Sequence, residues 1–134
     1  MASPSYELQV AIVTRLRANP AVSALVGTRI FDEVPKGAAF PYITIGEADE
    51  TSVDADCIDA FELSIDIDVW SRDPGFMQSK VISDAVRKAL KSPDLELPTN
   101  ALVLFNHRQT RSFRDEDGLT SHAVMTFEGI AEQP

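Results

Sequence analysis

Apolar and polar residues alternate most regularly between Phe61 and Trp70. Five apolar side chains occupy every second position of this stretch, and polar or acidic side chains occupy most positions between them. Successive side chains of a β-strand point to opposite faces of the sheet, so the pattern predicts a strand with one core face and one acidic face. The apolar members are Phe61, Leu63, Ile65, Ile67 and Val69, and the acidic members are Glu62, Asp66 and Asp68.

The N-terminal segment has the repeat of an amphipathic helix. Ser3 and Pro4 suit the cap and the first turn of a helix, and Asn19-Pro20 suits its end. Residues 21–26 are expected to add one short helical piece. The apolar positions that fall at intervals of four along the predicted helix are Leu8, Ile12 and Leu16.

A second amphipathic helix is predicted after residue 72. Asp73 is the expected cap and Pro74 the expected first helical residue. Two adjacent apolar columns follow, and together they make a stripe wide enough to cover a sheet. The columns are Met77, Val81, Ala85 and Ala89, beside Ile82, Val86 and Leu90.

The remaining segments complete an α+β domain. Residues 48–59 contain few apolar side chains, which predicts a long mobile loop between two strands. The order of elements then favours a mainly antiparallel β-sheet with the two amphipathic helices packed on one face, and residues 1–134 forming a single domain. The further predicted strands are 29–31, 42–47, 102–114 and 119–131.

Net charge limits the possible ligands. The formal charge is -9, and the segment from Gly37 to Ser71 holds nine acidic residues without a Lys or Arg. Such a surface repels phosphates, so specific DNA binding is not expected, although a repulsive wall would suit a passage for DNA. The single cysteine, Cys57, permits no internal disulfide and suits a reducing cytoplasm. Neither a signal peptide nor a membrane span is predicted.

Two groups of charged residues are candidate interface residues. Acidic side chains lie on the predicted strand at 61–70 and in the preceding loop, and basic side chains lie on the predicted strand at 102–114. Three interpretations stay open: a solvated face, salt bridges within the sheet, or contacts between subunits of a ring. A divalent metal on the carboxylates is a further alternative. The candidates are Asp54, Asp56, Glu62, Asp66, Asp68, Arg108, Arg111 and Arg114, with Arg108 and Arg114 predicted on one face and Arg111 on the other.

No catalytic site or cofactor site is predicted. A two-residue turn at Asp117-Gly118 would place His122 opposite Phe113 and His107 opposite Glu128, about 20 Å apart, which is too far for a shared metal. Nucleophile-elbow, phosphate-loop and dinucleotide motifs do not occur in the sequence. The protein is therefore expected not to be an enzyme.

An ordered set of short motifs resembles one family of phage proteins. The set comprises a hydrophobic-Asp-x-Val-Pro element at Phe31 to Pro35, a Pro-Tyr-hydrophobic strand opening at Pro41 to Ile45, and a strand that ends in Val69-Trp70-Ser71. With the two helices and the C-terminal hairpin, it is similar to the tail-completion or tail-terminator proteins of long-tailed, siphovirus-like bacteriophages and gene transfer agents.

The resemblance implies a structural protein of the virion, made in the bacterial cytoplasm. It implies a ring, expected to contain six copies, that caps the head-proximal end of the tail tube, ends its growth and forms the head-tail joining surface. The implied partners are other copies of the chain, the tail tube protein and a connector or stopper protein, with DNA passing through. The alternatives are a head-tail connector adaptor or stopper and, third, a small metal-dependent enzyme that uses Asp66 and Asp68.

Overall fold

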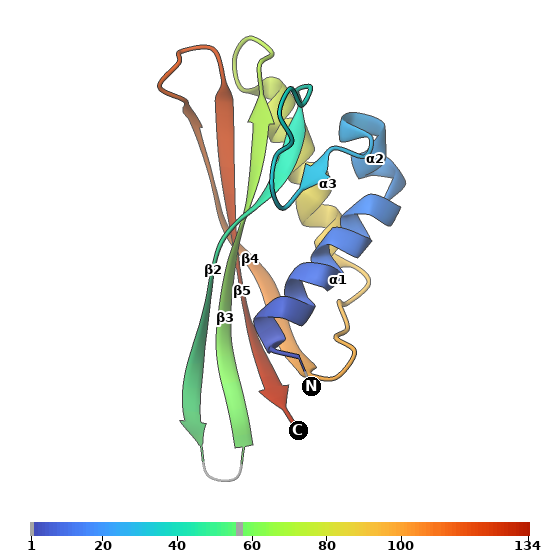
Figure 1. Ribbon diagram of the computed structural model, residues 1–134, viewed down its shortest axis with the longest axis vertical. Helices are drawn as coiled ribbons and strands as arrows, with labels where there is room; N and C mark the ends of the chain where they lie inside the picture. Colours follow the sequence, from blue (N-terminus) through green and yellow to red (C-terminus); the bar gives the residue numbers. More distant parts are fainter. Residues whose placement is uncertain (1, 56–57) are drawn as a thin grey trace.

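In the computed structural model, a single twisted sheet is covered on one face by helices (Figure 1). The structure describes residues 2–55 and 58–134. The five strands lie in the order β1-β2-β3-β5-β4, and all neighbours are antiparallel except β1 and β2. The α+β prediction is confirmed. The elements are α1 (Pro4–Ala18), α2 (Pro20–Val26), β1 (Ile30–Phe31), β2 (Tyr42–Ala55), β3 (Ile58–Ser71), α3 (Met77–Lys91), β4 (Ala101–Arg114) and β5 (Ser121–Gln133).

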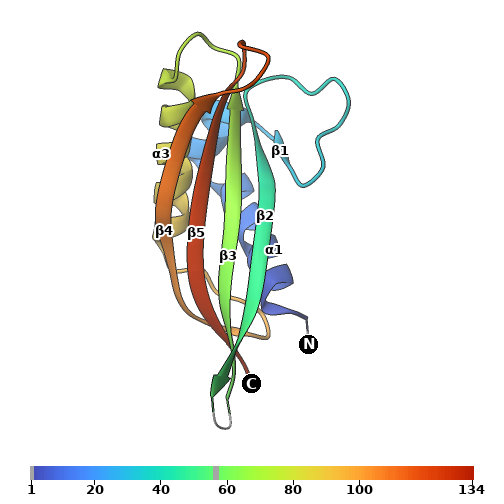
Figure 2. The ribbon, with the colours of Figure 1, turned by 90° about the vertical axis from the view of Figure 1, so that its left-hand side faces the viewer.

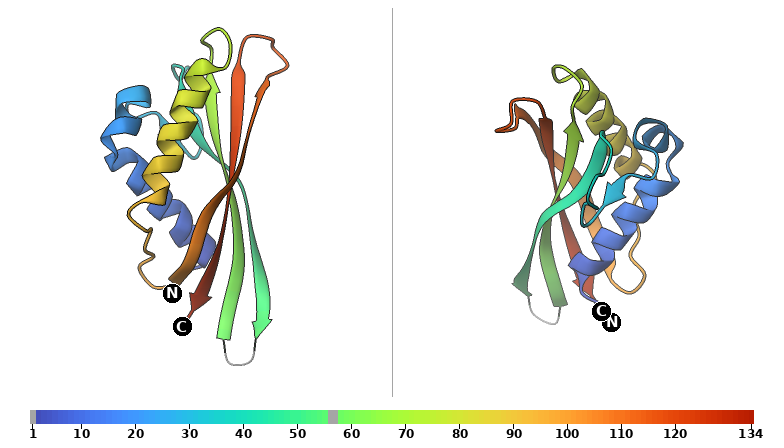
Figure 3. Two further views of the ribbon diagram at one scale, coloured as in Figure 1. Left: turned by 180° about the vertical axis from the view of Figure 1, so that it is seen from behind. Right: turned by 45° about the horizontal axis from the view of Figure 1, so that its top comes forward.

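The helices all lie on one side of the sheet, as Figure 3 shows from two further directions. α1 begins as predicted, because the Ser3 side chain accepts a hydrogen bond from the Tyr6 backbone N–H and Pro4 opens the first turn. Asn19 ends α1 and caps α2 through the Val22 N–H. The opposite face of the sheet carries no helix in the described residues (Figure 2).

The core lies between this helical layer and the sheet. Alternate residues of β3 point into it, as the period of two predicted, and their partners on β5 do the same. The buried apolar residues of these two strands are Leu63, Ile65, Ile67, Val69, Ala123, Met125, Phe127 and Ala131.

The predicted loop at residues 48–59 is wrong over most of its length. β2 continues to Ala55 and β3 begins at Ile58, so the two strands form one long hairpin, while Asp56 and Cys57 lie outside the described residues. The hairpin extends beyond the helices (Figure 1). Without a covering layer, this part of β2 needs no apolar face, and the alternation that marks a half-buried strand is missing.

The start and the buried face of α3 also differ from the prediction. The helix begins at Met77 after Phe76, not at Pro74, because residues 73–76 form a bend in which Gly75 adopts a φ of 77°. The first half of the column that begins at Met77 is solvent-exposed, with Met77 80% and Val81 55% exposed, whereas Ala89 at its end is buried. Ser79 and Ser83 are buried instead of Met77 and Val81. The buried residues of α3 are Ser79, Ile82, Ser83, Val86, Ala89 and Leu90.

The C-terminal hairpin has the predicted strands but a different register at its far end. Residues 115–120 connect them, and Phe113 pairs with His122 as predicted. The register then shifts at His107/Gln109, so His107 pairs with Phe127 and not with Glu128. A second register shift follows at Leu102/Leu104. Each shift inserts an extra residue on β4, which exchanges the faces of the residues beyond it.

Candidate assembly surfaces

The open face of the sheet carries the acidic row of β3. Glu62, Asp66 and Asp68 alternate with the buried apolar residues and therefore share this face, as predicted. Only Glu62 is fully exposed. Asp66 accepts a hydrogen bond from the Thr126 hydroxyl at 2.8 Å. The acidic row is therefore partly hydrogen-bonded to other residues of the sheet and is not only a solvent-exposed surface.

Asp68 is the most constrained acidic residue of this row. Its Oδ2 lies 3.1 Å from Nε2 of His122, and its Oδ1 is buried without a hydrogen-bond partner among the described residues. Burial raises the pKa of Asp68, the hydrogen bond and charge of His122 act to lower it, and the neighbouring Asp66 and Glu47 carboxylates raise it further. The pKa of Asp68 lies above its ordinary value of 3.8.

An aromatic row, which the sequence analysis missed, crosses the same face beside Asp68. His122 stacks on Trp70 with ring centroids 3.6 Å apart, and the Phe113 ring lies 4.8 Å on its other side. The Trp70 indole N–H donates to Oγ1 of Thr44 at 3.0 Å. Tyr42 extends the row towards β1, with its ring 6.4 Å from that of Trp70. The only signal in the sequence was that the aromatic residues occupy positions of the alternating pattern that are otherwise polar and therefore face away from the core.

The three arginines of β4 are divided between the faces differently from the prediction. Arg108 reaches Glu128 on the open face at 3.2 Å. Arg111 lies over the ring of Phe113, also on that face, whereas Arg114 lies over the ring of Phe76 next to α3. The register shift at His107/Gln109 is the reason, because it reverses the alternation between Arg108 and the later residues. Arg108 and Arg111 therefore share a face, and Arg114 lies on the other.

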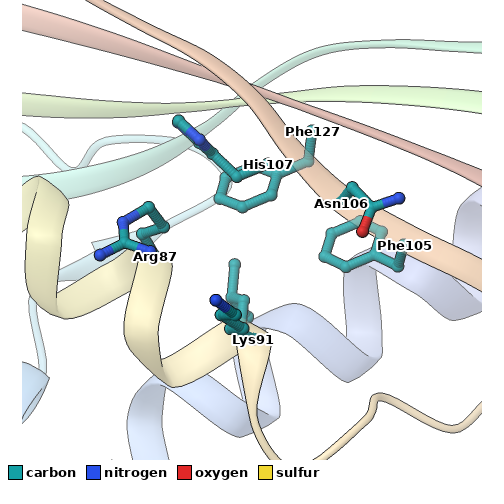
Figure 4. A pocket seen from close by; sticks show the side chains of 7 residues that line it. Arg87, Lys91, Phe105, Asn106, His107 and Phe127 are labelled. Carbon is teal, nitrogen blue, oxygen red and sulfur yellow. The ribbon is translucent and has the colours of Figure 1, made fainter.

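A groove runs between α3 and the outer edge of β4. One part of it is a cavity of about 220 Å³ that is lined by the apolar side chains of Leu90, Phe105 and Phe127. Arg87 and Lys91 lie at its rim (Figure 4). A second cavity of about 250 Å³ continues it along Leu102 to Asn106. Burial and the charge of Arg87 lower the pKa of His107, which also lines the groove.

The two sides of the sheet carry opposite charge. β2 and β3 contain eight acidic residues and no Lys or Arg, whereas α3 and β4 contain seven Lys and Arg residues and one acidic residue. Residue 54 contributes to the acidic count at the end of β2, and its side chain is not described. The acidic candidates Glu62, Asp66 and Asp68 lie on β3, the middle strand of the sheet, whereas the basic candidates lie on the edge strand β4.

Residues 2–55 and 58–134 contain no group of three His, Cys, Asp or Glu side chains placed to hold a metal ion. No described helix is long and apolar enough to cross a membrane.

These surfaces define a small α+β domain with an acidic edge strand β2 and a basic edge strand β4. A family model for tail completion protein gp17 matches residues 10–132, and the chain belongs to this family. It is therefore a structural protein with a tail-terminating role, located in the tail of a phage-like particle.

Solved structures agree with this assignment. A chain in the virion of a native gene transfer agent particle superposes with a TM-score of 0.90 and 28% identity, covering 98% of this chain and 99% of that one. The gp17 protein of bacteriophage SPP1 shares the fold, with a TM-score of 0.65, 22% identity, and coverage of 93% and 88%. No curated protein sequence matches the chain.

Proposed function

We propose that this protein forms a ring on the head-proximal end of a tail tube, with six copies as the expected number. The ring ends tube growth and offers the surface to which a connector or stopper protein of the neck binds. The observation that carries the proposal is the family match over residues 10–132, together with the close likeness to a chain of a gene transfer agent virion. The protein acts as a structural part and not as an enzyme.

The charge distribution supports an assembly of this kind. A ring needs two different surfaces on each subunit that complement each other, and the acidic and basic edges of the sheet meet this requirement. The net charge of -9 suits a channel through which DNA passes without specific binding.

Electron microscopy of tail tubes assembled without this protein tests the proposal. The purified chain is added to overlong tubes and, separately, to growing tube protein, and the tube ends are counted by negative stain. Caps at one end and an arrest of growth are the expected results. Tubes that stay uncapped and keep growing would contradict the proposal. Binding of the chain to portal-bearing heads in the same experiment would instead indicate an adaptor or stopper.

A further inference from the structure

The two edges of the sheet differ in what covers them. β1 pairs only with Ile43 and Thr44 of β2, so the edge of β2 from Gly46 to Val53 has no neighbouring strand among the described residues. β4 is the other edge strand, and its outer side borders the groove below α3. An edge strand presents backbone N–H and C=O groups that can pair with a further strand.

The direction of the strands allows a second copy to continue the sheet. β2 is antiparallel to β3, β3 to β5, and β5 to β4, so β2 and β4 run in opposite directions. When two copies are related by rotation about an axis along the strands, β2 of one copy lies beside β4 of the next in an antiparallel arrangement. The same contact repeats at each subunit, which is the condition for a closed ring.

The charges on the two edges complement each other on both faces. Asp49 of β2 lies on the open face because it pairs with Ser64, and Arg108 of β4 lies on that face beside Glu128. Glu50 lies on the helical side, where it accepts a hydrogen bond from the Ser5 N–H at 3.0 Å. Lys91 lies on the same side at the rim of the groove. All four side chains are exposed.

We infer that the Gly46 to Val53 edge of β2 in one copy pairs with the β4 edge of a second copy. Asp49 then faces Arg108 of the neighbouring copy, and Glu50 faces Lys91 at its groove. The inference rests on the proposed function, because it names the contact that closes the ring. The partner that pairs with the β4 edge beside the groove is thus another copy of the same chain.

Charge reversal separates this contact from other modes of association. One variant carries Lys91→Glu and Arg108→Glu, and the other carries Asp49→Lys and Glu50→Lys. Each variant alone brings like charges together and should weaken self-association about tenfold or more. Mixing the two restores complementary edges at every contact and should restore the assembly. The matched control for the first variant is Lys36→Glu with Lys80→Glu, which lowers the net charge by the same amount at exposed positions outside β4.

Native mass spectrometry and sedimentation velocity at low salt measure the result, with the urea midpoint of each variant as the test of folding. The single substitutions D49K and R108E provide a milder pair if a double variant is destabilised. Association of both variants at wild-type strength would overturn the inference. So would a mixture that fails to assemble, or wild-type chains that stay monomeric at about 1 mM.

The same variants distinguish failure of this contact from failure of the proposed function. If the wild-type chain caps tubes and both charge-reversal variants do so equally well, the edge contact is wrong while the terminator role stands. If mixing restores assembly but no chain caps a tube, the contact is right and the terminator role is wrong.

Discussion

Gly129 of β5 lies where β4 approaches most closely, and its replacement by Ala gives a quantitative test of the bulge at Leu102/Leu104. A Cβ atom at this position would lie 2.8 Å from the Leu104 carbonyl oxygen and 3.4 Å from Cδ1 of Phe105. The oxygen belongs to the backbone of β4, so the strand itself must move. Overpacking of this kind costs about 1–3 kcal/mol.

A compensating term comes from the unfolded chain. Replacing Gly by Ala reduces the freedom of the unfolded state and stabilises by about 0.4–1 kcal/mol where the native backbone is compatible. Subtracting the midpoints of the two ranges gives a net loss in the free energy of unfolding of about 1.3 kcal/mol for Gly129→Ala. For a chain of 134 residues, each kcal/mol lowers the melting temperature by about 3–4 °C. The expected decrease in the melting temperature is about 4–5 °C.

Urea unfolding followed by circular dichroism measures this change, and Gly46→Ala is the graded control. At Gly46 a Cβ atom would lie 3.1 Å from the Asp66 Cβ and the Asp68 Oδ1 and 3.2 Å from the Asp66 backbone oxygen, so these neighbours need to shift less than the Leu104 carbonyl oxygen does at Gly129. Gly46→Ala should stay within about 0.5 kcal/mol of the wild type. If Gly129→Ala proves as stable as the wild type with an unchanged urea dependence, β4 does not approach β5 as closely as described.

Three further substitutions test individual polar contacts. Arg15→Met removes hydrogen bonds from α1 to the carbonyl oxygens of Ala89 and Pro93 and should lower the free energy of unfolding by about 1–3 kcal/mol; an unchanged thermal midpoint would refute this. Glu7 is subject to burial, which raises its pKa, but hydrogen bonds from Thr99 and Asn100 outweigh burial and lower the pKa below 4.5. Its contribution to stability is present above that pH and is lost as the pH falls through the lowered pKa, so the difference between wild type and Glu7→Ala in urea should shrink from pH 7 to pH 3. The raised pKa of Asp68 has the opposite sign: the protonated form favours folding, and this stability is lost as the pH rises through the raised pKa. Asp68→Asn should therefore be at least as stable as the wild type at pH 7 and lose that advantage below pH 3.8, and a less stable variant at pH 7 would contradict the argument.

The parts of the fold that the sequence predicted are those with one buried face. β3 and α1 each place apolar residues at the period of their own structure, and both were located correctly because burial imposes that period. The far half of the β2–β3 hairpin lacks a covering layer, so its acidic residues resembled a loop. The apolar pattern of the sequence reports burial and not strand pairing, so the length of the hairpin strands could not be predicted from it.

The faces of β4 could not be predicted for a different reason. A bulge depends on the path of both strands and leaves no mark in the apolar pattern of an exposed edge strand. Because of a single inserted residue, Arg108 and Arg114 lie on opposite faces of the sheet, whereas the expected alternation placed them on the same face. The aromatic row was missed because Trp70 lies beside core residues in the sequence but on the opposite face of the strand.

Charge at the two edges also determines which kind of self-assembly is possible. An uncovered edge strand could pair with the same edge of another copy, and such a two-fold contact would stop at a dimer. Two acidic β2 edges or two basic β4 edges would place like charges side by side, which is unfavourable. Only the pairing of β2 with β4 brings opposite charges together, and this contact uses a different surface on each copy. A contact of that kind either closes into a ring or continues as a filament. Charge alone therefore favours the repeating contact over the dimer, and the angle between successive copies decides whether it closes.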